Sequence, residues 1–358
     1  MPAEVFRILV INPTATTTRI AVFENEEERL AADLAHSPAD LARFERVWDQ
    51  YLFRKDSITA HLQAAGVKLD SLHAVVGRGG LLKPVPGGVY TVNGAMLDDL
   101  RAGVQGEHAS NLGGILAYGI AHALSIPAYV VDPVSTDEMR PEARITGVPA
   151  IRRTSLSHAL NMRWVGRKAA AALGKAYDES NLVMAHLGAG ISVAAHRLGR
   201  MVDATNALED GPFGPERAGR LPAGDLVRLC FSGRYTEREL IRMLTSGGGL
   251  LAHLGTRDWR EVEARIAAGD ADARLVYEAM AYQVAKEIGA MAVALRARAD
   301  AIVLTGDLAH SALLTGWIAE RVEWIAPVLR FPGSEENRAL AAGTLWVLRG
   351  EEEARIYA

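Results

Sequence analysis

The chain has 358 residues, of which 49% are hydrophobic and 23% are charged, and its formal net charge is −4. This length favours two domains, and the composition is typical of a globular rather than a disordered protein. The mild negative charge excludes a sequence-wide attraction to nucleic acid or to an anionic membrane. No apolar run reaches the roughly 18 residues that a membrane span requires.

The start of the chain and its cysteine content indicate a compartment. Glu4 and Arg7 interrupt the first apolar stretch, which is unlike a secretory signal. The single cysteine, Cys230, excludes an intramolecular disulfide and is typical of a reducing environment. Leu226 and Val227 lie at helical spacing from Cys230, so we interpret this cysteine as a core residue rather than a nucleophile. We therefore expect a cytoplasmic protein.

Strand and helix patterns alternate in the first half of the chain. Residues 5–12 and 19–23 are predicted to form a hairpin, and residues 40–65 carry apolar side chains at helical spacing. The other predicted elements are strands within 71–80, 87–93 and 127–133 and helices over 93–100 and 108–126, with Asn93 as an N-cap. The stretch to about residue 150 is rich in Pro, Asp and Arg, which indicates a loop and a domain boundary.

The second half repeats the opening pattern of strand, small-residue turn and strand within residues 181–204. Thr236 and Glu239 have the spacing of a capping box, and Gly174 is suited to a helix C-terminus. The other predicted elements are helices over 157–174, 237–244, 272–297 and 337–349 and a strand within 299–311. Two similar α/β halves predict a bilobal protein with a ligand-binding cleft between them.

The turn of the first hairpin holds four threonines, at positions 14 and 16–18, where Asn-Gly or Asp-Gly is more usual. It is either a solvated turn between β-branched strands or a cradle of hydroxyl and N–H groups for an anion. The second hairpin turn, HLGAGIS over 186–192, favours the cradle, because Gly188 and Gly190 let the backbone approach a ligand closely. Neither turn is a P-loop or a dinucleotide-binding loop, since no GxxxxGK[ST] occurs and strand follows the glycines.

Arginine and acidic residues complete the candidate site. Arg78 lies between glycines directly after an apolar strand, and Arg217 and Arg220 lie in a Gly/Pro-rich loop, where bidentate contact with carboxylate or phosphate is favoured. For Mg²⁺, which prefers oxygen ligands, we select Asp132 at a strand end and a glutamate of PGSEEN. The Gly-Asp turn of VLTGDLAHS resembles turns that hold a ribose or adenine edge. The ten histidines are too scattered for a zinc site.

Taken in order along nearly the whole chain, these motifs resemble the acetate and butyrate kinase family. The segments that carry the resemblance are INPTATTTRIAVF, VVGRGGLLKPVPGGVY, GEHASNLGGILA, VVDP, RRTSLSHALN, MAHLGAGIS, GPFGPERAG, VLTGDLAHS and PGSEEN. The sequences GRGG, EHASNLG and PERAG are closer to butyrate kinase than to acetate kinase. The resemblance implies an α/β bilobal fold of the actin/hexokinase/Hsp70-like (ribonuclease H-like) type, with a duplicated hairpin-containing domain and a central cleft. We expect residues 1–148 with 334–358 to form an acid-binding lobe and residues 149–333 a nucleotide-binding lobe.

The resemblance also implies an activity. Members of the family phosphorylate a short-chain carboxylic acid with ATP and Mg²⁺, reversibly and by direct in-line transfer, giving the acyl phosphate and ADP. The implied acid is butyrate or a branched-chain analogue. The implied partners are this acid or its acyl phosphate and further copies of the chain, in a homodimer or larger homo-oligomer, with neither nucleic acid nor membrane.

Residue roles follow from the matched motifs. Arg78 and Arg217 match arginines near the carboxylate and the transferring phosphoryl group, and His186 matches the histidine that steadies that group in the transition state. His158 matches a second active-site histidine. The implied nucleotide contacts are Asn12, Thr16, Thr17, Thr18, Gly188, Gly190, Gly306 and Asp307. The implied metal contacts are Glu336, Asn12 and Asp132, with the choice between Glu335 and Glu336 left open and Asp132 also assigned to catalysis.

The sequence departs from the family in its first loop, where members usually read NPGS and this chain has Thr14 and Ala15. Loss of the glycine restricts the backbone unless φ is negative there. Ser157 stands where an aromatic residue usually precedes His158, and Ala189 replaces a glycine that is common in butyrate kinases.

Two alternatives stay open from the sequence. One is a sugar or polyol kinase of the same superfamily, with Asp132 as its base. The other is a non-catalytic ATP-binding protein. The pair of arginines argues against both, because such relatives rarely devote two arginines to the acceptor.

Overall fold

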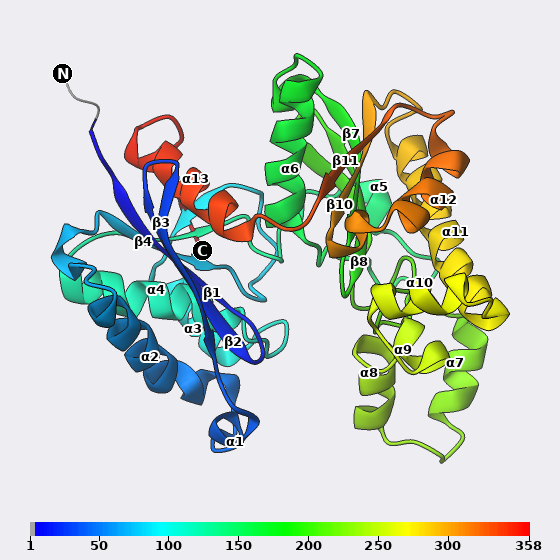
Figure 1. Ribbon diagram of the computed structural model, residues 1–358, viewed down its shortest axis with the longest axis horizontal. Coiled ribbons are helices and arrows are strands. Elements are labelled where there is room, and N and C mark those ends of the chain that lie inside the picture. The colour runs from blue at the N-terminus through cyan, green and yellow to red at the C-terminus, as the bar shows by residue number, and fades with distance from the viewer. Residues whose placement is uncertain (1–3) are drawn as a thin grey trace. The chain divides into compact units, whose positions relative to one another are not determined.

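The computed structural model describes residues 4–358 (Figure 1). The chain divides into two compact units. The first unit consists of the chain up to Thr136 together with Glu335–Ala358, and the second unit is Asp137–Ser334. No helix in the described range is long and apolar enough to cross a membrane.

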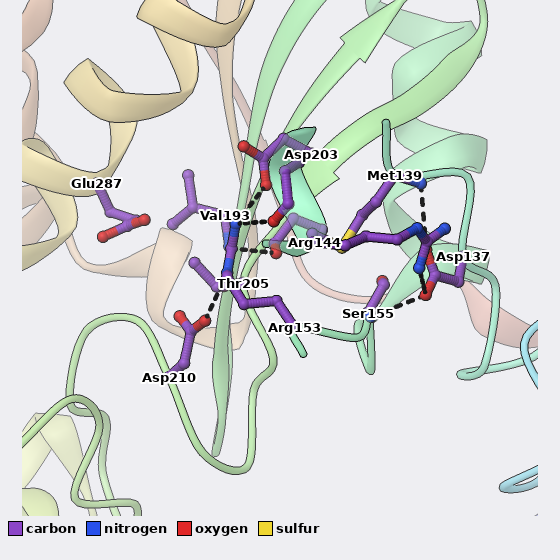
Figure 2. A network of polar contacts seen from close by, with 12 residues as sticks. Asp137, Met139, Arg144, Arg153, Ser155, Val193, Asp203, Thr205, Asp210 and Glu287 are labelled. Atoms are coloured by element: carbon purple, nitrogen blue, oxygen red, sulfur yellow. Dashed lines mark hydrogen bonds and ion pairs between the residues drawn. The ribbon is translucent and has the colours of Figure 1, made fainter. Parts of the chain in front are cut away.

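The first boundary comes earlier than the predicted residue 148, because the segment after Thr136 folds onto the second unit. Figure 2 shows polar contacts within this segment and between it and the rest of the second unit. The carboxylate of Asp137 accepts hydrogen bonds from Arg144 at 2.6 Å and from the N–H of Ser155 at 3.2 Å. Further along, Arg153 donates to Asp203 at 3.1 Å and to Asp210 at 3.3 Å.

The first unit is built on a mixed sheet of seven strands in the order β12-β5-β6-β4-β1-β2-β3. The predicted hairpin is confirmed as β1 and β2, which pair antiparallel, whereas β3 was not predicted from its Glu- and Ala-rich sequence. The strand bounds are β1 (Arg7–Pro13), β2 (Thr17–Glu24), β3 (Glu27–Ala35), β4 (Ala74–Arg78), β5 (Val89–Thr91), β6 (Ala128–Val131) and β12 (Arg355–Ile356).

Helices cover both faces of this sheet, α2, α3 and α4 on one and α13 on the other (Figure 1). The helix predicted over 40–65 is interrupted, and only its second part, α2, is long. The bounds are α1 (Pro38–Leu41), η1 (Val47–Gln50), α2 (Tyr51–Ala64), η2 (Leu69–Ser71), α3 (Gly94–Ala102), α4 (Asn111–Leu124) and α13 (Glu336–Leu348). Asn93 caps α3 as predicted, with its side chain accepting from the N–H of Met96.

The alternation of side chains along β1 sorts its residues between the two faces. Leu9 and Ile11 belong to the core under α2, α3 and α4. Asn12 therefore faces the other way, toward α13, which packs on β1, β4 and β6. On the opposite face, Gly77 and Gly113 allow β4 and α4 to approach so closely that a side chain at either would overlap the other's backbone. Gly77, which directly precedes Arg78, thus serves helix–strand packing.

The second unit has a sheet of five strands in the order β11-β10-β7-β8-β9. Three antiparallel strands followed by two parallel ones repeat the arrangement β3-β2-β1-β4-β6 of the first unit, so the predicted duplication is present in the topology. The strand bounds are β7 (Asn181–Leu187), β8 (Ile191–Arg197), β9 (Arg200–Ala204), β10 (Ala301–Gly306) and β11 (Val328–Pro332).

Within this unit α6 covers one face of the sheet, and α11 and α12 cover the other (Figure 1). The predicted capping box is confirmed, because the hydroxyl of Thr236 accepts from the N–H of Glu239 and the Glu239 carboxylate accepts from the N–H of Thr236. The bounds are α5 (Pro141–Arg144), α6 (Ala159–Ala172), η3 (Tyr177–Glu179), α7 (Ala223–Cys230), α8 (Glu237–Thr245), α9 (Gly249–Leu254), α10 (Trp259–Ala267), α11 (Ala271–Ala294), η4 (Asp307–His310) and α12 (Ala312–Val322).

The interpretation of Cys230 as a core residue is wrong, because this cysteine is exposed. It ends α7, a helix with no buried residue, and the next residue, Phe231, is 88% exposed. Leu226 is half-buried and Val227 is 55% exposed. Helical spacing identified an apolar stripe correctly but could not show that α7 lies at the surface.

Candidate active site

Three side chains meet at the end of β1 in the first unit. Strands β1 and β4 are parallel with Ile11 opposite Gly77, which brings Asn12 and Arg78 side by side at the carboxyl ends of their strands. Glu336 enters from the first turn of α13. Its Oε2 accepts from Arg78 at 2.7 Å and from Nδ2 of Asn12 at 2.8 Å.

This cluster is largely shielded from solvent, since the side chains of Arg78 and Glu336 are only 18% and 13% exposed. A carboxylate in the first turn of a helix is favoured by the helix dipole. The contacts of Arg78 with Glu336 and with Oδ1 of Asn12 both use one terminal nitrogen. The other edge of the guanidinium makes no hydrogen bond with the described part of the chain. Of the two glutamates in PGSEEN, Glu336 is the one that contacts both Arg78 and Asn12.

Asp132 follows the last residue of β6, whose Val131 is paired with Arg78. Its backbone has a φ of 38°, which is unusual for a residue other than glycine. The Oδ1 atom accepts from the N–H of Gly88 at 2.7 Å, and the N–H of Asp132 donates to the oxygen of Gly88 at 3.0 Å. One carboxylate oxygen of Asp132 therefore supports the chain entering β5.

The threonine-rich turn is ordered by its own side chains. The hydroxyls of Thr14 and Thr17 contact each other at 2.5 Å, and the N–H of Thr17 donates to Thr14 Oγ1 at 3.1 Å. The hydroxyl of Thr18 lies between the guanidinium of Arg54 at 3.0 Å and Nε2 of His36 at 2.8 Å.

Burial corrects one of the implied nucleotide contacts in this turn. Thr18 is fully buried, so it supports the turn from beneath and is not placed to touch a nucleotide. Thr17 is half-buried and committed to Thr14, whereas Thr16 is exposed.

In the second unit a row of polar side chains crosses the sheet. His186 pairs with Ser192 on β8 and with Thr305 on β10, so all three side chains lie on the face covered by α6. The beginning of α6 adds His158 and Asn161. His158 Nδ1 contacts Ser192 Oγ at 2.9 Å, and the two histidine rings stack with centroids 3.9 Å apart.

Asn161 sets the tautomer of His186. The hydroxyl of Thr305 donates to the oxygen of Gly333 at 3.2 Å, so it accepts from Nδ2 of Asn161 at 3.2 Å. The same amide nitrogen lies 2.9 Å from Nδ1 of His186 and donates to it. A neutral His186 therefore carries its proton on Nε2, the nitrogen next to Gly188 at the tip of the hairpin.

Arg217 and Gly190 come together at the same hairpin. The guanidinium of Arg217 fills the space that a side chain at Gly190 would need, and it donates to the oxygen of Ala207 at 3.0 Å. Its Nε is buried and has no hydrogen-bond partner among the described residues. Burial lowers the pKa of Arg217, because the charged form is poorly solvated. Such a group favours an anionic ligand.

Further charges anchor the loop that carries Arg217. Asp210 binds Arg153 at 3.3 Å, and Arg220 lies 3.4 Å from both Asp210 and Glu287 of α11. Figure 2 shows Arg153, Asp210 and Glu287. Burial raises the pKa of Glu287. Arg220 thus has a structural role at the base of the loop.

The Gly-Asp turn after β10 has a conformation that needs glycine. Gly306 has a φ of 92°, and a side chain there would overlap the backbone of Leu187. Its N–H and oxygen exchange hydrogen bonds with Gly333 at 3.0 and 2.9 Å. Asp307 is exposed and accepts from the indole N–H of Trp259 at 3.0 Å.

Two contributors escaped the sequence analysis. Asn161 lies three residues after His158, a spacing that places both on one side of a helix, so helical periodicity could have found it. Arg54 lies in an amphipathic segment and gave no signal, because its partners are about forty residues away in the chain.

The donor set of the first unit fits Mg²⁺. The described residues contain no group of three or more His, Cys, Asp or Glu side chains that could hold a metal by themselves. Kinase magnesium sites commonly use one or two carboxylates, with phosphate oxygens and waters completing the shell. Glu336 with the amide oxygen of Asn12 is a set of this kind.

Solved structures share the duplicated sheet arrangement. An acetate kinase from Porphyromonas gingivalis aligns with a TM-score of 0.78 and 18% identity, over 96% of this chain and 100% of that chain. A propionate kinase from Francisella tularensis aligns with a TM-score of 0.74 and 19% identity, over 94% of this chain and 98% of that chain. The fold is therefore the bilobal actin- and hexokinase-like kinase fold, and the predicted fold class is confirmed.

Sequence comparison narrows this class to a family. The sequence model described as the Acetokinase family matches residues 145–319. Butyrate kinase 2 of Clostridium acetobutylicum is 50% identical over 353 residues, which are 98% of this chain and 99% of that protein. This chain belongs to the acetokinase family. The predicted family is thus confirmed, together with the enzyme class, a phosphotransferase with a carboxyl group as acceptor.

Proposed function

We propose that this protein transfers the γ-phosphoryl group of ATP to the carboxylate of a short-chain acid, reversibly, giving an acyl phosphate and ADP. The preferred acid is butyrate or a branched analogue of similar size. The 50% identical relative is a butyrate kinase, which supports this choice of acid. We also propose a cytoplasmic enzyme that forms a homo-oligomer, and exposed apolar side chains such as Val293 and Trp324 support the self-association.

One observation carries the proposal. Arg217 is half-buried, its buried Nε has no partner in the described part of the chain, and Gly190 leaves room for its guanidinium beside the hairpin. The Nε2–H of His186 belongs to the same hairpin. Two hydrogen-bond donors of this kind suit a phosphoryl group, whose negative charge spreads over several oxygens during transfer.

We assign the first unit to the acid and the second unit to the adenosine part of the nucleotide. Arg78, oriented by Glu336 and Asn12, binds the acid's carboxylate, which is ionised at neutral pH and attacks without a general base. His186 and Arg217 donate to the phosphoryl oxygens in flight, and the backbone at Gly188, Gly190 and Gly306 accommodates the nucleotide. His158 keeps the His186 ring in place by stacking.

Glu336 and Asn12 would hold Mg²⁺, which neutralises phosphate charge when bound. A sugar kinase would instead need Asp132 as a base toward a hydroxyl group. The hydrogen bond from the N–H of Gly88 disfavours that role, because it commits Oδ1 of Asp132 to the backbone.

The test is a panel of short acids supplied with ATP and Mg²⁺, with acyl phosphate trapped as hydroxamate. We expect product with butyrate and isobutyrate, and loss of turnover by about two to three orders of magnitude in Arg217→Ala. Arg228→Ala is the matched control, because Arg228 only pairs with Asp225 on an exposed helix. Phosphorylation of glycerol or a hexose in place of every acid would overturn the proposal.

A further inference from the structure

Arg54, in the first turn of α2, is the most deeply buried arginine of the first unit, with no exposed surface. It makes no ion pair with a carboxylate anywhere in residues 4–358, and burial lowers its pKa to about 10, which leaves it charged at neutral pH. A buried charge requires compensation by hydrogen bonds. The partners of Arg54 therefore show what this residue is for.

Nearly all of its partners are oxygens of the threonine-rich turn. One terminal nitrogen donates to the oxygens of Thr14 and Thr17, both at 3.0 Å, and to the hydroxyl of Thr18 at 3.0 Å. The other donates to the oxygen of Ala15 at 3.1 Å. Gln50 completes the set from the preceding turn, accepting from the Nε and a terminal nitrogen at 3.0 and 2.9 Å.

These contacts orient the peptide groups of the turn. In a trans peptide the C=O and N–H bonds point in opposite directions. Because the oxygens of Thr14 and Ala15 point toward Arg54, the N–H groups of Ala15 and Thr16 point away from it. Neither N–H has a hydrogen-bond partner in the described part of the chain, and both residues are exposed.

We propose that Arg54 is a positioning residue for the polyphosphate of the nucleotide. It draws the carbonyls of the turn inward and so aims the N–H groups of Ala15 and Thr16, with the hydroxyl of Thr16, at phosphate oxygens. Its unneutralised positive charge lies directly behind the turn and favours an anion in front of it. This inference rests on the proposed use of ATP.

The same arrangement explains how the chain manages without the glycine of the family's loop. Neither Thr14 nor Ala15 has a positive φ, so neither needs glycine's conformational freedom. Thr14 instead closes the turn through Thr17, and Arg54 holds the remaining carbonyls. The backbone conformation that glycine would permit is replaced by one that a buried arginine enforces.

The experiment compares ATP and AMP binding by calorimetry, without acid, for the wild type, Arg54→Lys and Gln50→Ala. AMP lacks the β- and γ-phosphates, so its affinity reports nucleotide binding apart from this turn. Lysine keeps the charge but cannot reach five oxygens, and Gln50→Ala loosens Arg54 without removing it. We expect ATP affinity to fall about tenfold in Arg54→Lys and severalfold in Gln50→Ala, with AMP affinity unchanged.

Arg43→Ala is the matched control, because Arg43 pairs with Asp40 at the surface nearby. Steady-state kinetics should show a raised KM for ATP and an unchanged KM for the acid. Wild-type ATP affinity in Arg54→Lys, or equal losses for ATP and AMP, would overturn the inference. If Arg54→Lys does not fold, Gln50→Ala decides by the same criteria. If the wild type binds ATP but phosphorylates no acid, the proposed function is refuted, whereas the binding measurements still test the role of Arg54.

Discussion

The guanidinium of Arg217 occupies the space that a side chain at Gly190 would fill. The two residues lie 27 positions apart, in the motifs HLGAGIS and GPFGPERAG, and each explains the other. A small residue at the hairpin tip lets the long, half-buried side chain of Arg217 reach it, and the positive charge of Arg217 gives the hairpin its preference for an anion. The glycine is therefore part of the arginine's site.

The substitution Gly190→Ala should impair the function of Arg217. The added methyl group displaces the guanidinium, so we expect kcat to fall about 10- to 100-fold with little loss of thermal stability. Steady-state kinetics and thermal unfolding measure the two quantities. Ala189→Gly is the control, since it alters the same turn without adding volume. Wild-type turnover in Gly190→Ala would contradict the placement of Arg217.

Removal of the amide of Asn161 should release the tautomer of His186. Asn161→Leu removes the Asn161 donor to Nδ1, which confines the proton to Nε2, and we expect kcat to fall about 10- to 100-fold. The KM for ATP and for the acid should change much less. Asn93→Ala is the control for a loss of stability alone. It removes a helix cap in the first unit, so the free energy of unfolding should fall by about 1 kcal/mol while kcat is unchanged.

Glu336 and Glu335 can be separated by one substitution each. Glu336→Gln keeps the shape of the side chain but removes the charge that orients Arg78. We expect kcat/KM for the acid to fall about 100-fold and half-maximal activity to require more Mg²⁺. Glu335→Gln should retain nearly full activity. A larger effect at Glu335, in a magnesium titration of both variants, would reverse the assignment.

The sequence predicts those parts of the site that depend on local pattern. The hairpins β1–β2 and β7–β8 follow from alternating apolar runs around short polar turns, and their registers bring Asn12, His186 and Ser192 to the turns. Parallel pairing then adds Arg78 and Thr305 at the same sheet edges. These placements need only strand periodicity and the duplicated order of elements.

What escapes prediction depends on contacts distant in sequence. In the sequence, Arg54 is one residue of a helical pattern, and its contacts with the threonine-rich turn exist only in the folded protein. The segment after Thr136 looks like a linker, yet Arg153 binds it to the rest of the second unit through Asp203 and Asp210, which are 50 and 57 residues away. The burial of a charged group is a property of the tertiary fold, and no local pattern reports it.

The exposure of Cys230 can be measured directly. As the only cysteine of the chain, it should react with a thiol reagent in the native protein, with a stoichiometry of one per chain. We expect the labelled enzyme to retain its turnover, since α7 contributes no residue to the site. Protection of the thiol in the native state, with reaction only after denaturation, would show that another surface covers α7.

Buried His196 makes the stability of the second unit depend on pH. Burial, assisted by the charge of Arg163, lowers its pKa to about 3, and the hydroxyl of Tyr177 lies 2.7 Å from its Nδ1. Between pH 6.5, the pKa of the histidine in the unfolded chain, and about pH 3, the unfolded chain binds a proton at this histidine and the folded chain does not. The stabilisation is therefore complete above pH 6.5 and is lost as the pH falls through this window.

The double variant His196→Phe with Tyr177→Phe removes the titrating group without leaving a buried hydroxyl unpaired. We expect the free energy of unfolding, measured with urea between pH 7 and pH 5, to fall less steeply in the variant. The difference in slope should approach 1.4 kcal/mol per pH unit, the value for about one proton. His36, whose pKa is lowered by burial and by Arg54, titrates in the same direction in the first unit and is unchanged by this variant. Equal slopes in the two proteins would mean that His196 becomes protonated in the folded state, and that its buried position opens to water before the unit unfolds.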